Sequence, residues 1–292
     1  MNDTPDFLCI GFFCHDVKED GYLLGGTASY CSLAASRLGQ HTAVLTSVGN
    51  DFLFFDTFHQ EKIIVHNKSA LKTTVFHNIY REGIRTQYLY DRANTIEAKD
   101  LPVAWKNTPI VKFCLIANEV APSLLKAFPN ALKAATIQGW LRQWDNKGKI
   151  SPKTMDWDLL NTIDIVLFSD ADIPNIEEVL PIITNKVAVV VMTRGANGAS
   201  IFYKQEQYDF PSYPVEEVDP TGAGDVFAAA FVIAYANRKN IAEAASYAHT
   251  VASFIVEEEG AQFPSIEAIE DRLLAYQKLF PKTRKLMMDK VY

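Results

Sequence analysis

Hydrophobic and polar positions along the chain follow two alternating periods. Residues 7–13 and 41–49 form short apolar runs that predict buried strands, whereas residues 27–39 between them have helical apolar spacing that ends at Gly39. A strand, a helix and a second strand in succession indicate a parallel sheet with helical crossovers. The pattern returns after residue 109 and predicts strands within 110–117, 131–139, 163–169 and 186–193, edge strands at 198–203 and 208–213, and helices within 215–236, 240–258 and 265–280.

Residues 72–96 break this pattern because they are rich in β-forming residues. The stretches TTVFHNIY and TQYLY flank the turn REGIR and predict an antiparallel hairpin. Together with residues 14–24, the hairpin is expected to form a small β lid on a single α/β domain that spans residues 1–292. The exposed edge of such a lid can pair with a second copy of the chain, which would give a homodimer.

Four side chains of the hairpin are candidates for ligand contact. Tyr88 and Tyr90 share one face of the second strand, where they either cover a bound ring or pack within the hairpin itself. Tyr80 is a further aromatic residue on the first strand. Arg92, close to the end of the hairpin, either reaches down to a ligand or stays in solvent.

Composition narrows the class of protein. The 292 residues are 48% hydrophobic and 22% charged, as in ordinary globular domains. A net charge of −7 without a basic run excludes nucleic acid as the main partner. No apolar run reaches the ~18 residues of a membrane span, the N-terminal residues lack the features of a signal peptide, and the few cysteines form no C-x-x-C pair. A cytoplasmic protein without a membrane partner is therefore expected.

The stretch VEEVDPTGAGDVFAAAFVIAYA, residues 215–236, carries the candidate chemistry. Its second half is apolar on every side, which predicts a buried helix. The small residues at the start of this helix cannot cap its backbone N–H groups, so either Asp219 or Thr221 caps the turn or an anion such as a phosphate binds there. Asp225 would repel that anion unless it takes a proton from an attacking hydroxyl group. The simpler interpretation is that its charge only complements the helix dipole.

The segment DPTGAGD at residues 219–225 resembles the second signature of the PfkB carbohydrate kinase family, the ribokinase-like kinases, usually written D-T-x-G-A-G-D. The family also carries a Gly-Gly pair near its N-terminus, here Gly25 and Gly26, and a V-T-x-G-x-x-G segment, here VMTRGANG. The three motifs occur in the family's order and cover roughly residues 7–265.

The resemblance implies a fold and an activity. The fold would be a central, mostly parallel sheet flanked by helices, with a β lid over the acceptor site. The activity would be transfer of the γ-phosphoryl group of ATP, with Mg²⁺, to a hydroxyl group of a sugar or polyol. Matching the motifs residue by residue gives Asp225 as the catalytic base; Gly222, Ala223 and Gly224 as the anion hole; Asp16, Gly25 and Gly26 at the acceptor; Thr193, Gly195 and Gly198 at ATP; and Asp219 and Thr221 at a monovalent cation such as K⁺, which some members bind.

The sequence departs from the family's pattern at two positions. The family often has N-x-x-E near the metal, and Ser169 and Asp172 stand there in this chain, so Asp172 is expected to hold Mg²⁺ through water. Tyr30 stands where many sugar-specific members have Asn, and it is either a core aromatic residue or part of the site. The segment IQGWLRQWDNKGKI looks like the inositol-kinase-like branch, in which Arg142 would contact the acceptor or a phosphate; the alternative is a solvated arginine.

Two other functions stay open on the same fold: a nucleoside kinase, and a catalytically silent protein that binds a nucleotide or a sugar. The intact G-A-G-D sequence favours the enzyme, and hydrogen-bonding residues such as Asp16 and Arg142 favour an inositol or a sugar over a nucleoside. A Rossmann-type dehydrogenase is excluded because GFFCHD follows the first strand in place of G-x-G-x-x-G.

Overall fold

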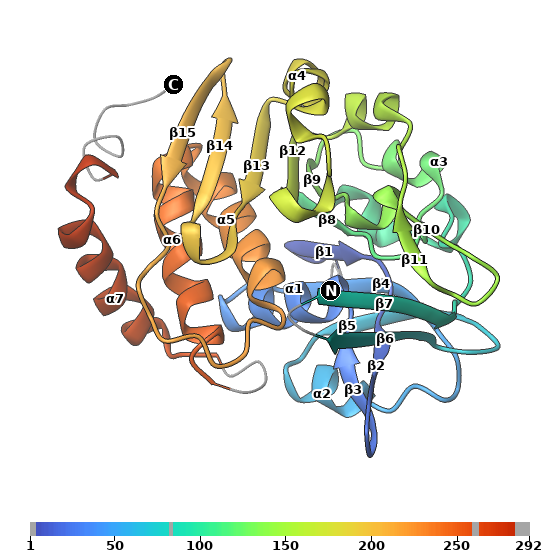
Figure 1. Ribbon diagram of the computed structural model, residues 1–292. Helices are drawn as coiled ribbons and strands as arrows, with labels where there is room; N and C mark the ends of the chain where they lie inside the picture. The colour runs from blue at the N-terminus through green and yellow to red at the C-terminus, as the bar shows by residue number, and fades with distance from the viewer. Residues whose placement is uncertain (1–3, 82–83, 259–262, 284–292) are drawn as a thin grey trace.

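The computed structural model describes residues 4–81, 84–258 and 263–283. The strands of its main sheet are β1 (Phe7–Ile10), β4 (Thr42–Val48), β5 (Ile64–Ser69), β8 (Ile110–Cys114), β9 (Leu132–Thr136), β12 (Ile165–Ser169), β13 (Val189–Thr193), β14 (Ala199–Tyr203) and β15 (Glu206–Phe210). They lie in the order β15-β14-β13-β12-β9-β8-β1-β4-β5 (Figure 1). The pairings from β5 to β13 are parallel, and β14 and β15 add an antiparallel edge. This confirms the predicted α/β class with a mostly parallel sheet.

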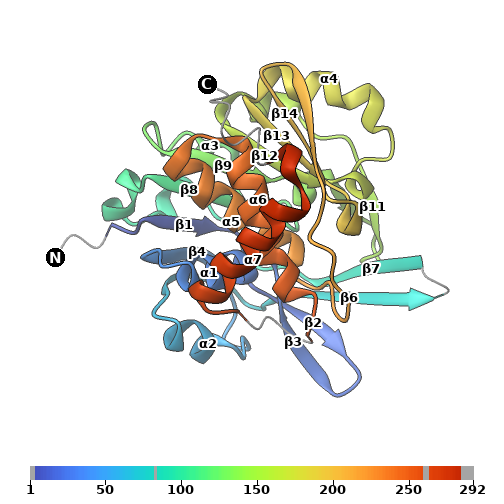
Figure 2. The same cartoon turned by 90° about the vertical axis from the view of Figure 1, so that its left-hand side faces the viewer.

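Helices cover both faces of the main sheet. One face packs against α1 (Thr27–Arg37), α5 (Ala223–Arg238), α6 (Ile241–Ile255) and α7 (Ile266–Leu279), which Figures 1 and 2 show stacked on the same side. The other face packs against α3 (Pro122–Leu125) and α4 (Ile176–Lys186), together with short 3-10 turns. A small helix, α2 (Phe55–Gln60), follows β4. None of the helices in the described ranges combines the length and the apolar character needed to cross a lipid bilayer.

Burial on both faces explains why the strands appear as continuous apolar runs. Along β1, Phe7 and Cys9 point into the core beneath α1 and α5, whereas Leu8 and Ile10 point into the core on the opposite face. All four side chains are fully buried. Parallel strands that are covered by helices on both sides need no polar face, so they lose the alternation that marks a half-exposed strand.

A second sheet of four strands stands against the edge of the main body. It contains β2 (Cys14–Lys18), β3 (Gly21–Gly25), β6 (Thr74–Arg81) and β7 (Ile84–Asp91), in the order β3-β2-β6-β7. The β6 and β7 strands pair antiparallel, which confirms the predicted hairpin, and Figure 2 shows this hairpin projecting from the body. We call these four strands the lid sheet; its action as a lid stays a prediction.

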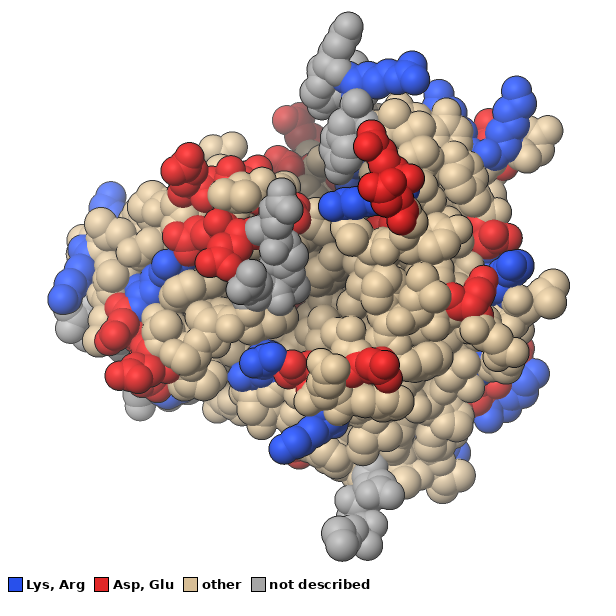
Figure 3. Space-filling view, turned by 90° about the horizontal axis from the view of Figure 1, so that it is seen from below, with Lys and Arg blue, Asp and Glu red and all other residues tan. Residues whose placement is uncertain are grey.

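Charge is distributed unevenly over the face that is seen from below. Figure 3 shows acidic side chains gathered on one half of this face, whereas lysine and arginine side chains are scattered. The lysine and arginine side chains on this face form no broad positive surface for an anionic ligand.

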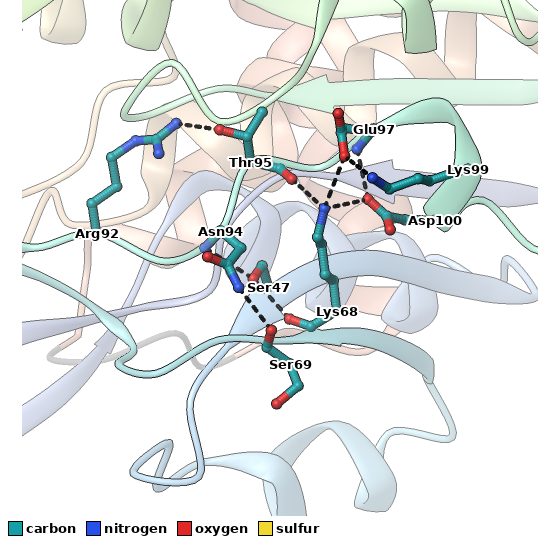
Figure 4. A network of polar contacts seen from close by, with 9 residues as sticks. All are labelled: Ser47, Lys68, Ser69, Arg92, Asn94, Thr95, Glu97, Lys99 and Asp100. Atoms are coloured by element: carbon teal, nitrogen blue, oxygen red, sulfur yellow. Dashed lines mark hydrogen bonds and ion pairs between the residues drawn. The ribbon is translucent and has the colours of Figure 1, made fainter.

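The chain returns from the hairpin to the main body through a fixed polar network (Figure 4). The Lys68 ammonium group at the end of β5 donates to the carbonyl oxygen of Thr95 at 2.7 Å and to Asp100 Oδ2 at 2.8 Å. Asn94 donates through its side-chain amide to the Ser69 carbonyl oxygen at 2.9 Å. These contacts hold the base of the hairpin against the edge of the main sheet.

Arg92 belongs to the same return segment. Its guanidinium group donates to the carbonyl oxygens of Ala117 at 2.8 Å and Asn118 at 2.7 Å, and to Thr95 Oγ1 at 3.1 Å. Both predictions for this side chain were wrong, because it neither faces a ligand nor remains in solvent. It ties the end of the hairpin to the loop after β8.

Several elements lie outside the sequence prediction. The β5 strand reads IVHNKS, with a polar second half and little burial, so it carries no strong strand pattern. The α4 helix contains Pro181, which is unfavourable inside a helix. Two paired strands are also missing from the prediction: β10 (Arg142–Trp144) and β11 (Ile150–Pro152). Each has three residues, which is too short to show an alternation of apolar and polar side chains.

Candidate active site

The start of α5 is built around a glycine that no other residue could replace without strain. Gly222 precedes the helix with a φ of 80°, and a Cβ atom there would lie 2.5 Å from Cδ1 of Tyr30. The Ala223 amide donates to the Pro220 carbonyl oxygen at 3.2 Å. Within the described part of the chain, the amides of Gly222 and Gly224 have no hydrogen-bond partner. Two of the three predicted anion-hole amides are thus free to bind a phosphate.

Asp225 lies in the first turn of α5, directly after these amides. Burial raises its pKa to about 6. A hydrogen bond with Thr27 and the positive charges of Lys112 and Arg142 oppose this rise, whereas the charge of Asp172 adds to it. A carboxylate whose pKa lies close to neutrality can accept a proton in a reaction and release it afterwards, as a general base must.

Two cavities meet at this helix start. The larger one has a volume of about 650 Å³, and it includes Pro220, Ala223 and Gly224 in its wall. The smaller one has a volume of about 340 Å³ and includes Pro220, Gly222 and Asp225. The beginning of α5 therefore separates two ligand-sized spaces, with the free amides and the carboxylate between them.

The smaller cavity is lined mainly by polar side chains. Asp16 enters it from β2, and burial raises the pKa of this carboxyl group to about 6, although the charges of Arg142 and Arg85 oppose the rise. Gly25 permits this position, because a Cβ atom there would lie 2.3 Å from Asp16 Oδ2. Gly26, with a φ of 97°, also lines the cavity and precedes α1.

Arg142 is buried rather than solvated. It is 8% exposed, lines the smaller cavity, and donates through Nη1 to the Ile116 carbonyl oxygen at 3.2 Å. Burial lowers its pKa to about 10, which still leaves the guanidinium group charged at neutral pH. The structure thus brings Arg142 together with Asp16 and Asp225 around one cavity, as the predicted site required.

The lid sheet contributes a polar edge to the smaller cavity. Asn78 and Gln87 lie opposite each other on β6 and β7, joined by a hydrogen bond of 2.8 Å, and both line the cavity together with Arg85 and Phe76. Sequence reasoning missed these four residues. The alternation along β7 was the available signal, since Arg85 and Gln87 occupy the face opposite to Thr86 and Tyr88.

The tyrosines of the hairpin lie on the other face. Tyr88 and Tyr90 stack on each other with ring centroids 6.1 Å apart, and the Tyr90 hydroxyl group contacts His77 Nδ1 at 3.0 Å. The suggestion that they cover a bound ring was wrong, and the alternative of packing within the hairpin is confirmed. The side chain of Tyr80 lies outside the described part. Tyr30 instead lines the cavity beneath Gly222, with its hydroxyl group donating to the Leu24 carbonyl oxygen at 3.0 Å.

The larger cavity brings the three residues predicted for ATP together. Thr193, Gly195 and Gly198 all line it. Gly198 has a φ of 86°, and a Cβ atom there would lie 2.1 Å from the Phe210 carbonyl oxygen, so the turn after β13 requires glycine. Most of the remaining wall is apolar or aromatic, with Phe227, Val256 and Phe280 among its residues.

His249 on α6 is a further residue of this wall that sequence reasoning missed. Burial lowers its pKa to about 3, so the ring is neutral, and it hydrogen-bonds the Phe210 backbone. Its Nε2 atom is buried and has no hydrogen-bond partner among the described residues. An isolated histidine in an alanine-rich helix gives no sequence signal that would distinguish it from a core residue.

The predicted metal residues are engaged with protein groups. Asp172 accepts hydrogen bonds from Gln138 Nε2 at 2.6 Å and from the Ser169 amide at 2.9 Å. Asp219 accepts one from the Thr221 amide at 2.9 Å. The described ranges contain no group of three or more His, Cys, Asp or Glu residues that could hold a metal ion. Mg²⁺ at a nucleotide is commonly held by one or two carboxylates together with phosphate oxygens and water, and Asp172 lies beside Gln138, which lines the smaller cavity. The Mg²⁺ and K⁺ assignments stay predictions.

Comparison with known proteins places these motifs in a family. The profile described as "pfkB family carbohydrate kinase" matches residues 15–269. An inositol 3-kinase of Oryza sativa subsp. japonica is 27% identical over 252 residues, which is 78% of this chain and 62% of the rice protein. A nucleoside kinase of Methanothermobacter thermautotrophicus is 42% identical over 299 aligned positions, covering 90% of this chain and 93% of that protein.

Solved structures share the fold. A pyrophosphate-dependent kinase in the ribokinase family, complexed with a pyrophosphate analog and myo-inositol, superposes with a TM-score of 0.77 at 20% identity. This superposition covers 90% of the present chain and 99% of that one. At this level of identity, the likeness supports the fold alone.

Proposed function

This chain belongs to the pfkB family of carbohydrate kinases, and we propose that it transfers the γ-phosphoryl group of ATP to a hydroxyl group of a small polyol such as an inositol or a sugar. Membership of the family makes it a phosphotransferase. The observation that carries the proposal is the junction of the two cavities at the start of α5. A donor in the larger cavity and an acceptor in the smaller one would meet at Asp225 and the free amides.

The proposed mechanism follows from this junction. The acceptor hydroxyl group lies beside Asp225, which accepts its proton as the oxygen attacks the γ-phosphorus atom. The bond between that phosphorus and the β–γ bridging oxygen breaks, and ADP leaves. The amides of Gly222 and Gly224 stabilise the charge on the transferred group. Bound Mg²⁺ would neutralise charge on the phosphates, with Asp172 holding it through water.

The shape of the larger cavity supports ATP as the donor. Pyrophosphate would fill only a small part of its about 650 Å³ and would leave the apolar wall formed by Phe227, Val256 and Phe280 uncovered. A nucleobase would cover that wall, which supports a nucleoside triphosphate as the donor.

The lining of the smaller cavity supports a polyol as the acceptor. Asp16, Asn78, Gln87 and Arg142 offer fixed donors and acceptors for several hydroxyl groups. The tyrosine pair that could have stacked on a nucleobase faces away from it. A nucleoside kinase is the second candidate, because the relative from Methanothermobacter, at 42% identity, carries that name.

A comparison of acceptors and donors tests the proposal. The purified chain is assayed for ADP release and for the phosphorylated product with myo-inositol, ribose, fructose, adenosine and cytidine, using ATP and then pyrophosphate. We expect the highest kcat/KM for a polyol with ATP and no turnover by the Asp225→Asn control. A nucleoside preferred by about tenfold or more, a difference of ~1.4 kcal/mol in transition-state binding, would reject the polyol. Turnover with pyrophosphate alone would reject ATP.

A further inference from the structure

A charged side chain is buried inside the main sheet close to the site. Lys112 lies in the middle of β8 and is fully buried. Its ammonium group donates to Thr136 Oγ1 and, at 3.3 Å, to the Phe113 carbonyl oxygen, both of which are uncharged. Within the described ranges, no carboxylate oxygen lies within 4.0 Å of it. Burying an ammonium ion without a compensating charge is strongly unfavourable, so this lysine needs an explanation.

Lys112 and the start of α5 border the same hydrophobic core, and β8 contacts α5. Lys112 lies on the sheet face that packs against α1 and α5, since its neighbours Ile110 and Cys114 on β8 belong to that core. The Cys114 thiol group contacts the Lys112 carbonyl oxygen at 3.6 Å, and the Cys31 thiol group contacts the Asp225 carbonyl oxygen at 3.1 Å. Both acceptors are backbone carbonyl oxygens.

The thiol groups cannot supply the missing negative charge. Burial raises the pKa of the Cys9 thiol, and it raises the pKa values of Cys31 and Cys114 well above their ordinary value. All three are therefore neutral near pH 7. Asp225 is a carboxylate in the first turn of α5, the helix that packs on this face of the sheet.

We propose that Lys112 is a positioning residue that keeps the Asp225 carboxylate ionised, so that it can act as the base of the proposed kinase reaction. The role rests on the proposed function. A positive charge in a poorly polarisable interior acts over several ångströms, because water does not screen it. The ammonium group favours the ionised carboxylate from below, while the acceptor hydroxyl group approaches from the cavity above.

Among the charged groups around Asp225, Lys112 favours the ionised carboxylate more than the others do. Arg142 faces Asp225 across the smaller cavity, but it also faces Asp16 there and is attracted to Asp172. Asp16 and Asp172 are acids, and their charges raise the pKa of an adjacent carboxyl group. The effect of Lys112 in lowering the pKa of Asp225 exceeds that of Arg142.

The pH dependence of the reaction tests the proposal. Lys112→Met removes the charge and keeps the length of the side chain. We expect the acid limb of kcat/KM for the acceptor to move to higher pH by about one unit, and the activity on the alkaline plateau to recover most of the wild-type value. Thr136→Val is the matched control, because it removes a partner of Lys112 but not the charge, and its limb should stay in place. A loss of activity that is equal at every pH would overturn the proposal.

A second measurement does not depend on activity. Urea unfolding of the wild type, Lys112→Met, Asp225→Asn and the double variant at alkaline pH gives the coupling between the two positions. We expect Lys112→Met to be clearly less destabilising in the Asp225→Asn background, and additive effects would overturn the pairing. If Lys112→Met alone does not fold, its rescue by Asp225→Asn supports the pairing, and failure in both backgrounds rejects it. An inactive wild type would reject the proposed function while leaving this coupling measurable.

Discussion

Burial gives Asp16 and Asp225 similar acidities, although they have different tasks. Each pKa is raised to about 6, and the charge of Asp225 contributes to the rise at Asp16. Asp225 lies at the helix start where the two cavities meet, whereas Asp16 lies among the polar residues of the smaller cavity. Asp225 must be ionised to accept a proton, and an ionised Asp16 accepts stronger hydrogen bonds from hydroxyl groups than its protonated form.

Replacing the carboxylate of Asp225 should abolish proton transfer without removing the donor site. We expect Asp225→Asn to lower kcat by roughly two to four orders of magnitude, the range of a positioned general base. The Kd of ATP, measured by calorimetry, should change little, because the walls of the larger cavity are intact. A loss of kcat below about tenfold would remove Asp225 from the role of base.

The shared pKa of about 6 predicts an unusually steep acid limb. Both carboxylates lose their charge as the pH falls through about 6, so log kcat/KM for the acceptor should fall with a slope approaching two. Asp16→Asn leaves one titrating group and should reduce the slope to one, with a higher KM for the acceptor and little change in the KM for ATP. A slope of one in the wild type would show that only one of the two ionisations matters.

At the scale of elements, the start of α5 contains two glycines that are needed for different reasons. Gly222 has a positive φ and packs against the Tyr30 ring, so Gly222→Ala should destabilise the fold by about 1–3 kcal/mol. A Cβ atom at Gly224 meets nothing within 4 Å, so its space belongs to the ligand. Gly224→Val should therefore keep the Tm close to that of the wild type and lose roughly a hundredfold in kcat, as expected when an oxyanion donor is blocked.

Thermal unfolding and steady-state kinetics of the two variants distinguish these roles. A normal kcat for Gly224→Val would place the phosphate elsewhere. An unchanged Tm for Gly222→Ala would show that the backbone can relax around the tyrosine.

The sequence predicted those elements whose pattern is local. The apolar runs of β1 and β8 and the all-round apolar α5 identified the buried strands and the central helix. The G-A-G-D motif predicted a helix start with unbonded amides and a carboxylate in its first turn, and the structure has both at the start of α5. The α4 helix escaped prediction because Pro181 contradicts its local preference, and its packing against the sheet outweighs that cost.

The acceptor site could be predicted only in part, because it depends on pairing between distant segments. Which of Gln87 and Tyr88 faces the cavity follows from the register of β6 with β7, and a shift of one residue would exchange them. Lys112 stands out as a charge in the run IVKFC, yet its relation to Asp225 arises only when β8 passes beneath α5.

At the scale of the whole molecule, the site follows from the direction of the strands. Gln138 follows β9, Asp172 follows β12 and Gly195 follows β13, so each lies at the carboxyl end of a parallel strand, and Asp16 lies on β2, the lid-sheet strand that comes after β1. Open α/β sheets bind ligands at this edge. The lid sheet lines the smaller cavity from one side, and the two cavities lie next to each other at the start of α5.

The lid sheet also leaves one edge free, which bears on the assembly of the molecule. The outer edge of β7 is covered, because the Leu89 amide donates to the Gly148 carbonyl oxygen at 2.8 Å. The β3 strand is outermost on the other side, and its Tyr22 and Leu23 side chains are 45% and 43% exposed. An open edge strand that carries exposed apolar side chains is suited to pairing with another strand.

We therefore expect the chain to form a homodimer through β3 of the lid sheet. Sedimentation velocity at micromolar concentration should show a dimer for the wild type and a monomer for Leu23→Lys, because a buried lysine at the centre of the new interface would be left unpaired. The matched control is Leu71→Lys, at an equally apolar residue that is 94% exposed and outside the lid sheet, and it should remain dimeric. Because the β3 edge adjoins the strand that carries Asp16, loss of the dimer should raise the KM for the acceptor more than the KM for ATP. A monomeric wild type, or a dimer that Leu23→Lys leaves intact, would show that β3 is not the interface.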